Sequence, residues 1–222
     1  MTPEDILAGL LERYPALDGN RGDILAAYGV LEKCFSGGGR VYLCGNGGSA
    51  ADALHIVGEL MKSFVMKRHV GGPFAERLRA MYPGEAEYML SHLEGALPAF
   101  ALVENSSLNY AFCNDVSPDM VFAQQVYGYA RPGDVLIGIS TSGNAVNVLN
   151  AVRAAKAIGA EVIGLTGGTG GGLAKLCDCA IVVPETETYK VQELHLPVYH
   201  ALCMMIERRF FGETVKCGCT PG

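Results

Sequence analysis

The sequence alternates between short apolar runs and longer segments with helical periodicity from residue 41 to residue 211. The apolar runs have the length of buried strands, and turns rich in glycine or polar residues separate them from the segments that follow. The expected strands are 41–44, 96–103, 134–140, 161–167 and 179–184. Strands that alternate with helices form βαβ units, so the sequence predicts an α/β fold with a parallel sheet covered by helices on both faces.

Helical segments precede the first strand and fill most of the intervals between strands. The expected helices are 4–14, 20–36, 49–66, 117–130, 144–160 and 191–211. Ser117 fits the cap of one of them, with Pro118 in its first turn. Segment 67–96 is also helical in pattern but has no obvious place in the sheet. We therefore predict a single domain over residues 1–222, with N-terminal helices in 1–36 and a helical insertion at 67–96.

Two polar loops follow expected strands. GNGGS (45–49) comes after the strand 41–44, and STSGN (140–144) comes after the strand 134–140. In a parallel sheet both loops lie at the carboxyl ends of strands, where ligands bind. Backbone amides at helix N-termini and serine or threonine hydroxyls bind phosphate without arginine. The alternative is a pair of ordinary polar loops, with Asn144 as a helix cap. Two such loops together favour a phosphate site.

The chemistry of the two loops limits the kind of phosphate compound. Neither loop carries the P-loop lysine, and GNGGSAAD does not fit the dinucleotide-binding fingerprint. We therefore expect the phosphate to belong to a small metabolite rather than to a nucleotide.

His55 and Glu59 lie four residues apart in the segment that follows the first loop, so on a helix they share one face. A pair on a helix surface would contribute only about 0.2–0.5 kcal/mol to stability. The neighbouring helix positions are apolar, which predicts a buried helix. Because a buried carboxylate must be paired, we interpret His55 and Glu59 as members of a functional site.

Composition argues against nucleic acids and membranes as partners. The net charge is −6 and no run of basic residues is present. No apolar run approaches the ~18 residues of a membrane span. The acidic, amphipathic N-terminus lacks the pattern of a signal peptide, so we expect a cytoplasmic protein.

Most of the eight cysteines occupy positions where small apolar residues belong, which favours reduced thiols. Cys177 with Cys179, and Cys217 with Cys219, form two C-x-C pairs. A metal role for these pairs is the less favoured interpretation, because paired zinc motifs space their cysteines two to four residues apart.

The N-terminal helices and the final helix carry more apolar surface than one sheet can cover, as in LLERY and ALCMMIERRFF. Such surface is usually hidden against a partner, so the sequence predicts a homo-oligomer.

Four motifs together resemble a known family: GNGGSAAD, ALHIVGEL, GDVLIGISTSGN and VQELHLPVYH. They are similar to the sugar isomerase (SIS) domain, and within it most similar to the sedoheptulose 7-phosphate isomerases, also called phosphoheptose isomerases. The resemblance covers nearly the whole chain except 67–96. It implies a three-layer sandwich with a five-stranded parallel sheet of flavodoxin-like topology. It also implies a homotetramer that isomerises a sugar phosphate at subunit interfaces.

The resemblance assigns residues to roles. Glu59 matches the catalytic base, and His200 matches the acid. One zinc ion per subunit, held weakly, is implied with the ligands His55, Glu59, Gln192 and His200. The implied substrate-binding residues are Asn46, Gly47, Gly48, Ser49, Glu59, Asn114, Asp115, Ser140, Thr141, Ser142 and Gln192. Two positions depart from the family pattern: Ala145 replaces a serine that would donate to phosphate, and Ser63 replaces an arginine.

Periodicity in the last helix leaves an alternative open. At about 100° per residue, His200 lies about 20° from Glu193 and about 80° from Gln192, which would pair it with Glu193. Pro197 should kink the helix, so the family motif is preferred and Gln192 is retained. His195 is interpreted as structural or as lying at a neighbouring subunit.

Two other functions compete with heptose isomerisation. SIS domains also occur as sugar-phosphate sensors, and a relative of these isomerases acts in the initiation of DNA replication through protein contacts. A protein of either kind could keep the loops without the chemistry. The remaining alternative is an isomerase of another ketose or amino-sugar phosphate.

Overall fold

The computed structural model describes residues 2–212, in which five parallel strands form one sheet. The strands are β1 Val41–Cys44, β2 Ala99–Ala101, β3 Val135–Ile139, β4 Glu161–Gly167 and β5 Cys179–Val183. They lie side by side in the order β2-β1-β3-β4-β5, and each neighbouring pair is parallel. The predicted α/β fold with a five-stranded parallel sheet and flavodoxin-like strand order is therefore confirmed.

β2 is shorter than the apolar run 96–103 because it is an edge strand that pairs only with the short strand β1. Val41 to Leu43 pair with Ala99 to Ala101. The N–H of Leu102 still donates to Leu43 O at 2.9 Å, and the chain then turns although β1 continues to Cys44. Pairing with a strand of only four residues, and not the length of the apolar run, limits the length of this strand.

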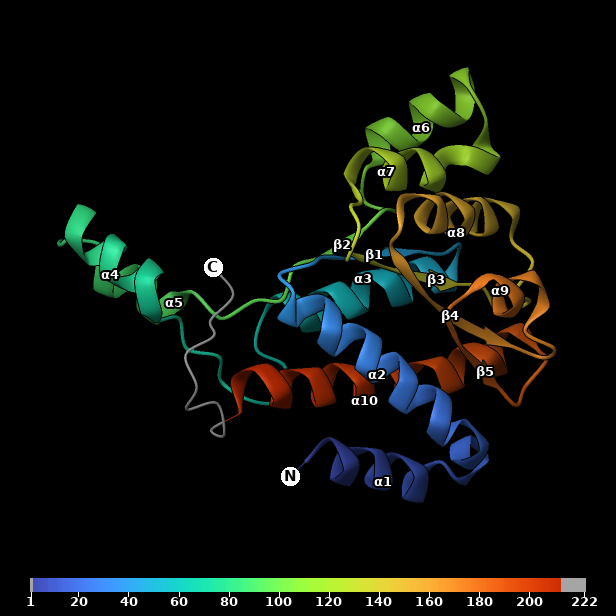
Figure 1. Ribbon diagram of the computed structural model, residues 1–222, viewed down its shortest axis with the longest axis horizontal. Coiled ribbons are helices and arrows are strands. Elements are labelled where there is room, and N and C mark those ends of the chain that lie inside the picture. The colour runs from blue at the N-terminus through green and yellow to red at the C-terminus, as the bar shows by residue number, and fades with distance from the viewer. Residues whose placement is uncertain (1, 213–222) are drawn as a thin grey trace.

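Alternate strand residues supply two hydrophobic cores, one on each face of the sheet. In β1, Val41 and Leu43 join one core, and Tyr42 and Cys44 join the other. The helices over the first core are α1 Pro3–Arg13, α2 Arg21–Ser36, α3 Gly48–Met61 and α10 Thr188–Phe211. Those over the second are α7 Val121–Tyr129, α8 Val146–Ile158 and α9 Gly171–Leu176. Figure 1 shows the sheet between the two helical layers, so the three-layer arrangement is also confirmed.

Two helices were not expected from the sequence. α6 Ser106–Asp115 has no buried residue in this chain, so it lacks the apolar stripe that would identify it. The short α9 begins with glycines and shows no periodic pattern. The predicted cap Ser117 is present, but it accepts the N–H of Asp119 at 3.3 Å at the start of a short 3₁₀ turn that precedes α7.

α1 packs along α10 and buries its apolar face there. Leu7, Leu10 and Leu11 of α1 are buried in the first core, next to α10 residues such as Leu202 and Ile206. The apolar surface of the N-terminal helices is therefore covered within the chain. This surface therefore gives no support to the expected oligomer, although the sequence suggested that it would.

α10 is a continuous helix of 24 residues and contains Pro197. Pro197 and the residues after it stay packed on the sheet, and Val198 and Tyr199 are buried. Within residues 2–212 no helix is both long and apolar enough to cross a membrane.

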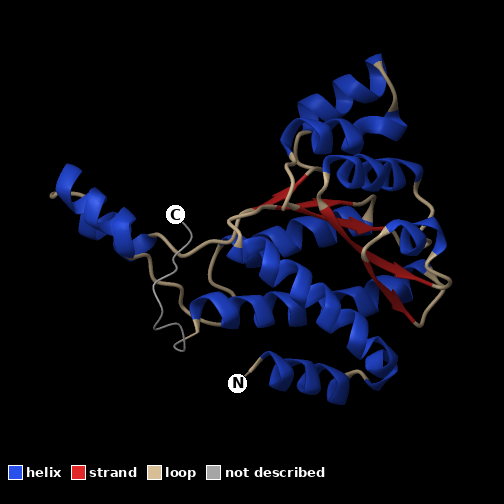
Figure 2. Cartoon of the chain, viewed as in Figure 1, coloured by secondary structure: helices blue, strands red, loops and turns tan. Residues whose placement is uncertain are grey.

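Residues 69–94 form an arm that extends away from the rest of the molecule, as Figures 1 and 2 show. The arm contains α4 Gly72–Met81 and α5 Ala86–His92, which pack against each other. Its two ends meet where the N–H of Gly95 donates to the carbonyl of Arg68 at 2.9 Å. Several large apolar side chains on the arm are exposed: Phe74, Met81, Tyr82, Tyr88 and Met89.

A buried ion pair lies at the base of the arm. Arg68 and Glu207 are both 0% exposed, and Arg68 Nε donates to Glu207 Oε1 at 2.7 Å. The same guanidinium donates to the carbonyl oxygens of Glu59 and Leu60, each at 2.7 Å. Arg68 therefore joins the last turn of α3, which carries Glu59, to α10.

Candidate active site

The first polar loop connects β1 to α3 and brings α10 close to the start of α3. Gly47 has φ +55° and ψ −121°, a conformation that other residues rarely adopt. A side chain at Gly48, the first residue of α3, would collide with the amide of Gln192 on α10. Ser49 is buried, and its N–H donates to the carbonyl of Asn46 at 3.0 Å. The glycines thus allow Gln192 to lie against the N-terminus of α3.

The second polar loop follows β3 and is fixed to α9 through Asn144. Its amide Nδ2 donates to the carbonyl of Ser142 at 2.9 Å, and its Oδ1 accepts the N–H of Gly172 at 3.0 Å. Gly143 has φ +68° and its N–H donates to Ser140 O at 2.9 Å. The N-cap of α8 is Ala145, so the alternative role of Asn144 as a cap of that helix is wrong.

The first polar loop is linked directly to the start of α8. Asn46 Nδ2 donates to Asn147 Oδ1, and Asn147 Nδ2 donates to Asn46 Oδ1, each at 2.9 Å. This reciprocal amide pair fixes the loop after β1 against the helix that follows the loop after β3. Asn147 was not singled out from the sequence, because nothing in the sequence shows that it faces Asn46.

His55, Glu59 and His200 form a cluster between α3 and α10. His55 Nε2 lies 3.2 Å from Glu59 Oε1 and 3.4 Å from His200 Nε2. The rings of His55 and His200 are nearly perpendicular, with centroids 4.9 Å apart, and Phe64 lies beside His200 with centroids 5.5 Å apart. Two elements far apart in sequence thus present an imidazole pair and a carboxylate to one point.

Burial shapes the acid–base properties of this cluster. The Glu59 side chain is only 13% exposed, and its Oε2 is buried without a hydrogen-bond partner. Burial lowers the pKa of His200 below its ordinary value, His55 lowers it further, and Glu59 opposes the shift. The pKa of His200 therefore lies below that of a solvated histidine, and Glu59 has a free oxygen for a proton or a cation.

The four metal ligands implied by the sequence do not form a complete coordination shell. Among residues 2–212, no group of three His, Cys, Asp or Glu side chains is drawn together closely enough to hold a metal ion. Cys177 and Cys179 are free thiols and belong to no such group, and Cys217 and Cys219 lie outside the described residues.

Other candidate residues lie apart from the cluster. Asn114 and Asp115 end α6, are exposed, and bond to each other, with Asn114 Nδ2 donating to Asp115 Oδ1 at 2.8 Å. Glu193 is exposed, so the pairing with His200 that periodicity suggested is wrong. His195 is 0% exposed and contacts the carbonyl of Thr166 at 3.3 Å, and burial lowers its pKa to about 4. His195 is thus a structural histidine.

Sequence reasoning missed Asp52 and Tyr199. The Tyr199 hydroxyl donates to Asp52 Oδ1 at 3.3 Å and lies 3.0 Å from His55 Nδ1. Asp52 lies three residues before His55 and so on the same side of α3, which is a signal the sequence offered. Tyr199 lies two residues after Pro197, where the helical periodicity is hard to follow, and it looks like an ordinary buried aromatic residue.

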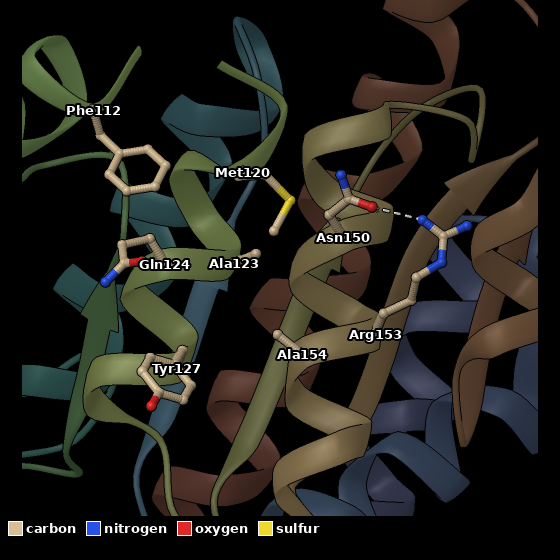
Figure 3. Close-up of a pocket in the computed structure, with 8 residues that line it drawn as sticks. All are labelled: Phe112, Met120, Ala123, Gln124, Tyr127, Asn150, Arg153 and Ala154. Carbon is tan, nitrogen blue, oxygen red and sulfur yellow. Dashed lines mark hydrogen bonds between the residues drawn. The ribbon is translucent and has the colours of Figure 1, made fainter. Parts of the chain in front are cut away.

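A groove of about 510 Å³ lies on the opposite helical layer, between α7 and α8. Figure 3 shows the hydrogen bond that Arg153 donates to Asn150 on α8, with Tyr127 on the neighbouring helix α7. The groove is lined by Phe112, Met120, Ala123, Gln124, Tyr127, Asn150, Arg153 and Ala154. None of these residues belongs to the cluster or to the polar loops, so the groove is separate from the candidate active site.

Comparison with known proteins identifies the family. A model of the SIS domain matches residues 90–167. The phosphoheptose isomerase of Rhodospirillum rubrum is 41% identical over 184 residues, which are 83% of this chain and 84% of that protein. That of Nitratiruptor is 43% identical over 171 residues, which are 77% of this chain and 78% of that protein. This chain belongs to the phosphoheptose isomerase family.

Solved structures of phosphoheptose isomerases share the fold. The enzyme from Neisseria gonorrhoeae superposes with a TM-score of 0.71 at 33% identity, covering 90% of this chain and 94% of that chain. The one from Francisella tularensis gives a TM-score of 0.73 at 28% identity, covering 94% and 100%.

The two departures from the phosphoheptose isomerase pattern have structural roles of their own. Ser63 Oγ accepts the N–H of Arg68 at 3.0 Å, and the N–H of Ser63 donates to Glu94 at 2.8 Å, so Ser63 holds the base of the arm. Ala145 supplies the N-cap position of α8 without a side-chain hydrogen bond. Neither residue adds a charge or a hydroxyl to the polar loops.

Proposed function

We propose that this protein is a phosphoheptose isomerase, an aldose–ketose isomerase that converts sedoheptulose 7-phosphate into D-glycero-D-heptose 7-phosphate through an enediol. The His55–Glu59–His200 cluster, built between α3 and α10, is the observation that carries the proposal. Membership of the phosphoheptose isomerase family supports the same reaction.

The substrate phosphate is proposed to bind between the two polar loops. The first loop offers Asn46, Gly47, Gly48 and Ser49 at the N-terminus of α3, where backbone N–H groups and the helix dipole favour an anion. The second offers the hydroxyls of Ser140, Thr141 and Ser142. The Asn46–Asn147 amide pair keeps the first loop next to α8, which supports a shared site for both loops.

Replacing Ser142 with Ala should raise KM for the sugar phosphate, with a smaller effect on kcat. The Ser142 side chain is exposed in the second loop, and a hydrogen bond to a charged group contributes about 1.5–3 kcal/mol, so KM should rise about tenfold or more. Steady-state kinetics measures this change. Ser106→Ala, which removes an exposed hydroxyl on α6, is the matched control, and an unchanged KM in the Ser142 variant would refute the proposed phosphate position.

The chain supplies a base and an acid for proton transfer between C1 and C2. The free Oε2 of Glu59 is suited to take the carbon-bound proton, because this oxygen has no hydrogen-bond partner of its own in the chain. His200 is suited to protonate the C2 carbonyl oxygen, which gives the neutral enediol, and then to take the proton of the C1 hydroxyl as the aldose carbonyl forms at C1. Glu59 returns its proton to the neighbouring carbon, so the protein ends the cycle unchanged.

The donor set at this position fits zinc, although the ligands are not drawn together as a complete group. Two imidazole nitrogens on one tetrahedral zinc ion lie about 3.3–3.4 Å apart. His55 Nε2 and His200 Nε2 lie 3.4 Å apart, and the free oxygen of Glu59 gives a third donor. We propose that these residues and Gln192 hold one zinc ion per subunit, weakly because an amide carbonyl is a poor ligand. When bound, the ion would act as a Lewis acid toward the substrate oxygens.

The protein is further proposed to be a cytoplasmic homotetramer. The six described cysteines are free, which suits a reducing compartment. The exposed apolar side chains of the arm and of α6, such as Tyr88 and Tyr110, support assembly. We expect light scattering at micromolar concentration to give the mass of four chains, and a monomer would rule out an active site shared between subunits.

The reaction itself is tested by exchange of substrate protons with deuterated solvent. C7, C6 and C5 ketose phosphates are incubated with the protein, with and without zinc, and followed by NMR. Exchange at C1 of sedoheptulose 7-phosphate together with formation of the aldose is expected. Binding of sugar phosphates without exchange on any of them would replace the isomerase with a sugar-phosphate sensor.

A further inference from the structure

The Tyr199 hydroxyl lies between a carboxylate and the side of His55 that faces away from the cluster. It donates to Asp52 Oδ1 at 3.3 Å and lies 3.0 Å from His55 Nδ1. We propose that Asp52 and Tyr199 are positioning residues that keep the proton of His55 on Nδ1. Nε2 then keeps a free lone pair that faces Glu59 and His200.

The number of available protons fixes the tautomer of His55. A tyrosine hydroxyl has one hydrogen to donate, and an ionised carboxylate can only accept. With that hydrogen on Asp52, the Tyr199 oxygen can interact with His55 only by accepting a proton from Nδ1. A neutral imidazole has a single N–H group, so Nε2 must be the unprotonated nitrogen.

The surroundings hold this chain of hydrogen bonds in place. Tyr199 is 2% exposed on α10, and its ring packs edge-on against His55 with centroids 5.4 Å apart. Burial raises the pKa of Tyr199, and Asp52 raises it further, so the hydroxyl keeps its hydrogen. Asp52 Oδ2 is buried without another partner, which leaves Tyr199 as its only side-chain donor among the described residues.

The position of the His55 proton matters because a second acceptor, Glu59, competes for it. Glu59 Oε1 lies 3.2 Å from His55 Nε2, so without Tyr199 the carboxylate would draw the proton to Nε2. That tautomer has no lone pair left on Nε2 for a cation. The role of the Asp52–Tyr199 pair toward a metal therefore rests on the proposed function, whereas the position of the proton does not. Outer hydrogen-bond partners commonly fix the tautomer of a metal-binding histidine in this way.

The position of the proton is tested on the metal-free, full-length protein with ¹⁵N-labelled histidine, above the ordinary histidine pKa. Two-bond ¹H–¹⁵N spectra distinguish protonated from unprotonated ring nitrogens, and loss of a signal in His55→Gln identifies His55. In the wild type we expect the proton on Nδ1. In Tyr199→Phe we expect it on Nε2, next to Glu59.

The variant Asp52→Asn changes the direction of the hydrogen bonds of Tyr199 while leaving the packing of its ring in place. Its amide can donate to the Tyr199 oxygen, which turns the hydroxyl hydrogen toward His55 Nδ1 and moves the imidazole proton to Nε2, although Tyr199 is still present. Tyr42→Phe is the matched control, because it removes a hydroxyl that donates to Tyr129 O on the opposite face of the sheet. The His55 proton should stay on Nδ1 in this control.

Zinc affinity, measured by competition with a chelator, gives a second readout. Tyr199→Phe and Asp52→Asn should each weaken binding about 10–100-fold, and Tyr42→Phe should not change it. A wild-type proton on Nε2, or one that stays on Nδ1 in both variants, would overturn the proposal. Failure of the isomerase reaction would leave the spectra unaffected, so the two proposals fail independently.

Discussion

Replacing Glu59 with Gln should lower kcat by about 10²–10⁴-fold and change KM little, because a positioned base contributes that factor to proton transfer. The amide has the same shape but cannot take a proton from carbon. Its amide N–H can donate to the unprotonated His55 Nε2, so the packing between α3 and α10 should survive. Steady-state kinetics and solvent deuterium exchange on the substrate both measure the loss.

The control for this variant is Glu193→Gln, which makes the same change at an exposed glutamate on α10. It should retain wild-type turnover. Binding of sugar phosphate by Glu59→Gln, followed by calorimetry, should also stay close to wild type. Near-normal turnover in Glu59→Gln would exclude Glu59 as the base, and a loss of folding in place of turnover would identify a structural carboxylate.

Replacing Arg68 with Met should lower the free energy of unfolding by about 3–5 kcal/mol, the usual cost of removing one partner of a buried ion pair. The variant leaves the Glu207 carboxylate buried without its cation, since both residues are 0% exposed. It also removes the donors to the carbonyl oxygens of Glu59 and Leu60. Urea denaturation followed by circular dichroism measures the change.

The matched control is Arg79→Met on the arm, where Arg79 pairs with Glu87 in solvent and its loss should have little effect. A double variant, Arg68→Met with Glu207→Met, should recover only part of the loss. Glu207 also accepts the N–H groups of Phe64 and Val65 at 2.8 and 2.9 Å, and both would lose their acceptor. Wild-type stability of Arg68→Met would show that the pair contributes no net stabilisation.

The sheet could be predicted because its signals are local. β1, β3, β4 and β5 are apolar runs followed by turn residues, and each begins and ends within a residue or so of the prediction. The length of the edge strand β2 was overestimated, because it is limited by pairing with the short strand β1 and not by the strand's own sequence. α6 was missed because none of its residues is fully buried, and only Phe112 and Cys113 pack partly against the second core.

The candidate site could be predicted only where its residues share one element or one motif. His55 and Glu59 lie on one face of α3, and their spacing alone indicated a pair. Arg68, Asn147 and Tyr199 act through contacts across the sequence, for instance 139 residues from Arg68 to Glu207. No local pattern encodes such contacts. Periodicity even favoured Glu193 over Gln192, because it does not show which side of α10 faces the first loop.

The closed base of the arm makes this part of the chain free to change in length. Arg68 and Gly95 are hydrogen-bonded neighbours, so residues between them can be shortened, extended or exchanged without moving the strand that follows. Closing a longer loop costs only about 0.6 kcal/mol for each doubling of its length. Selection can therefore alter the arm by insertion and deletion while α3 and β2 keep their spacing. Homologues with the same catalytic helices are expected to differ most in length at this point of the chain.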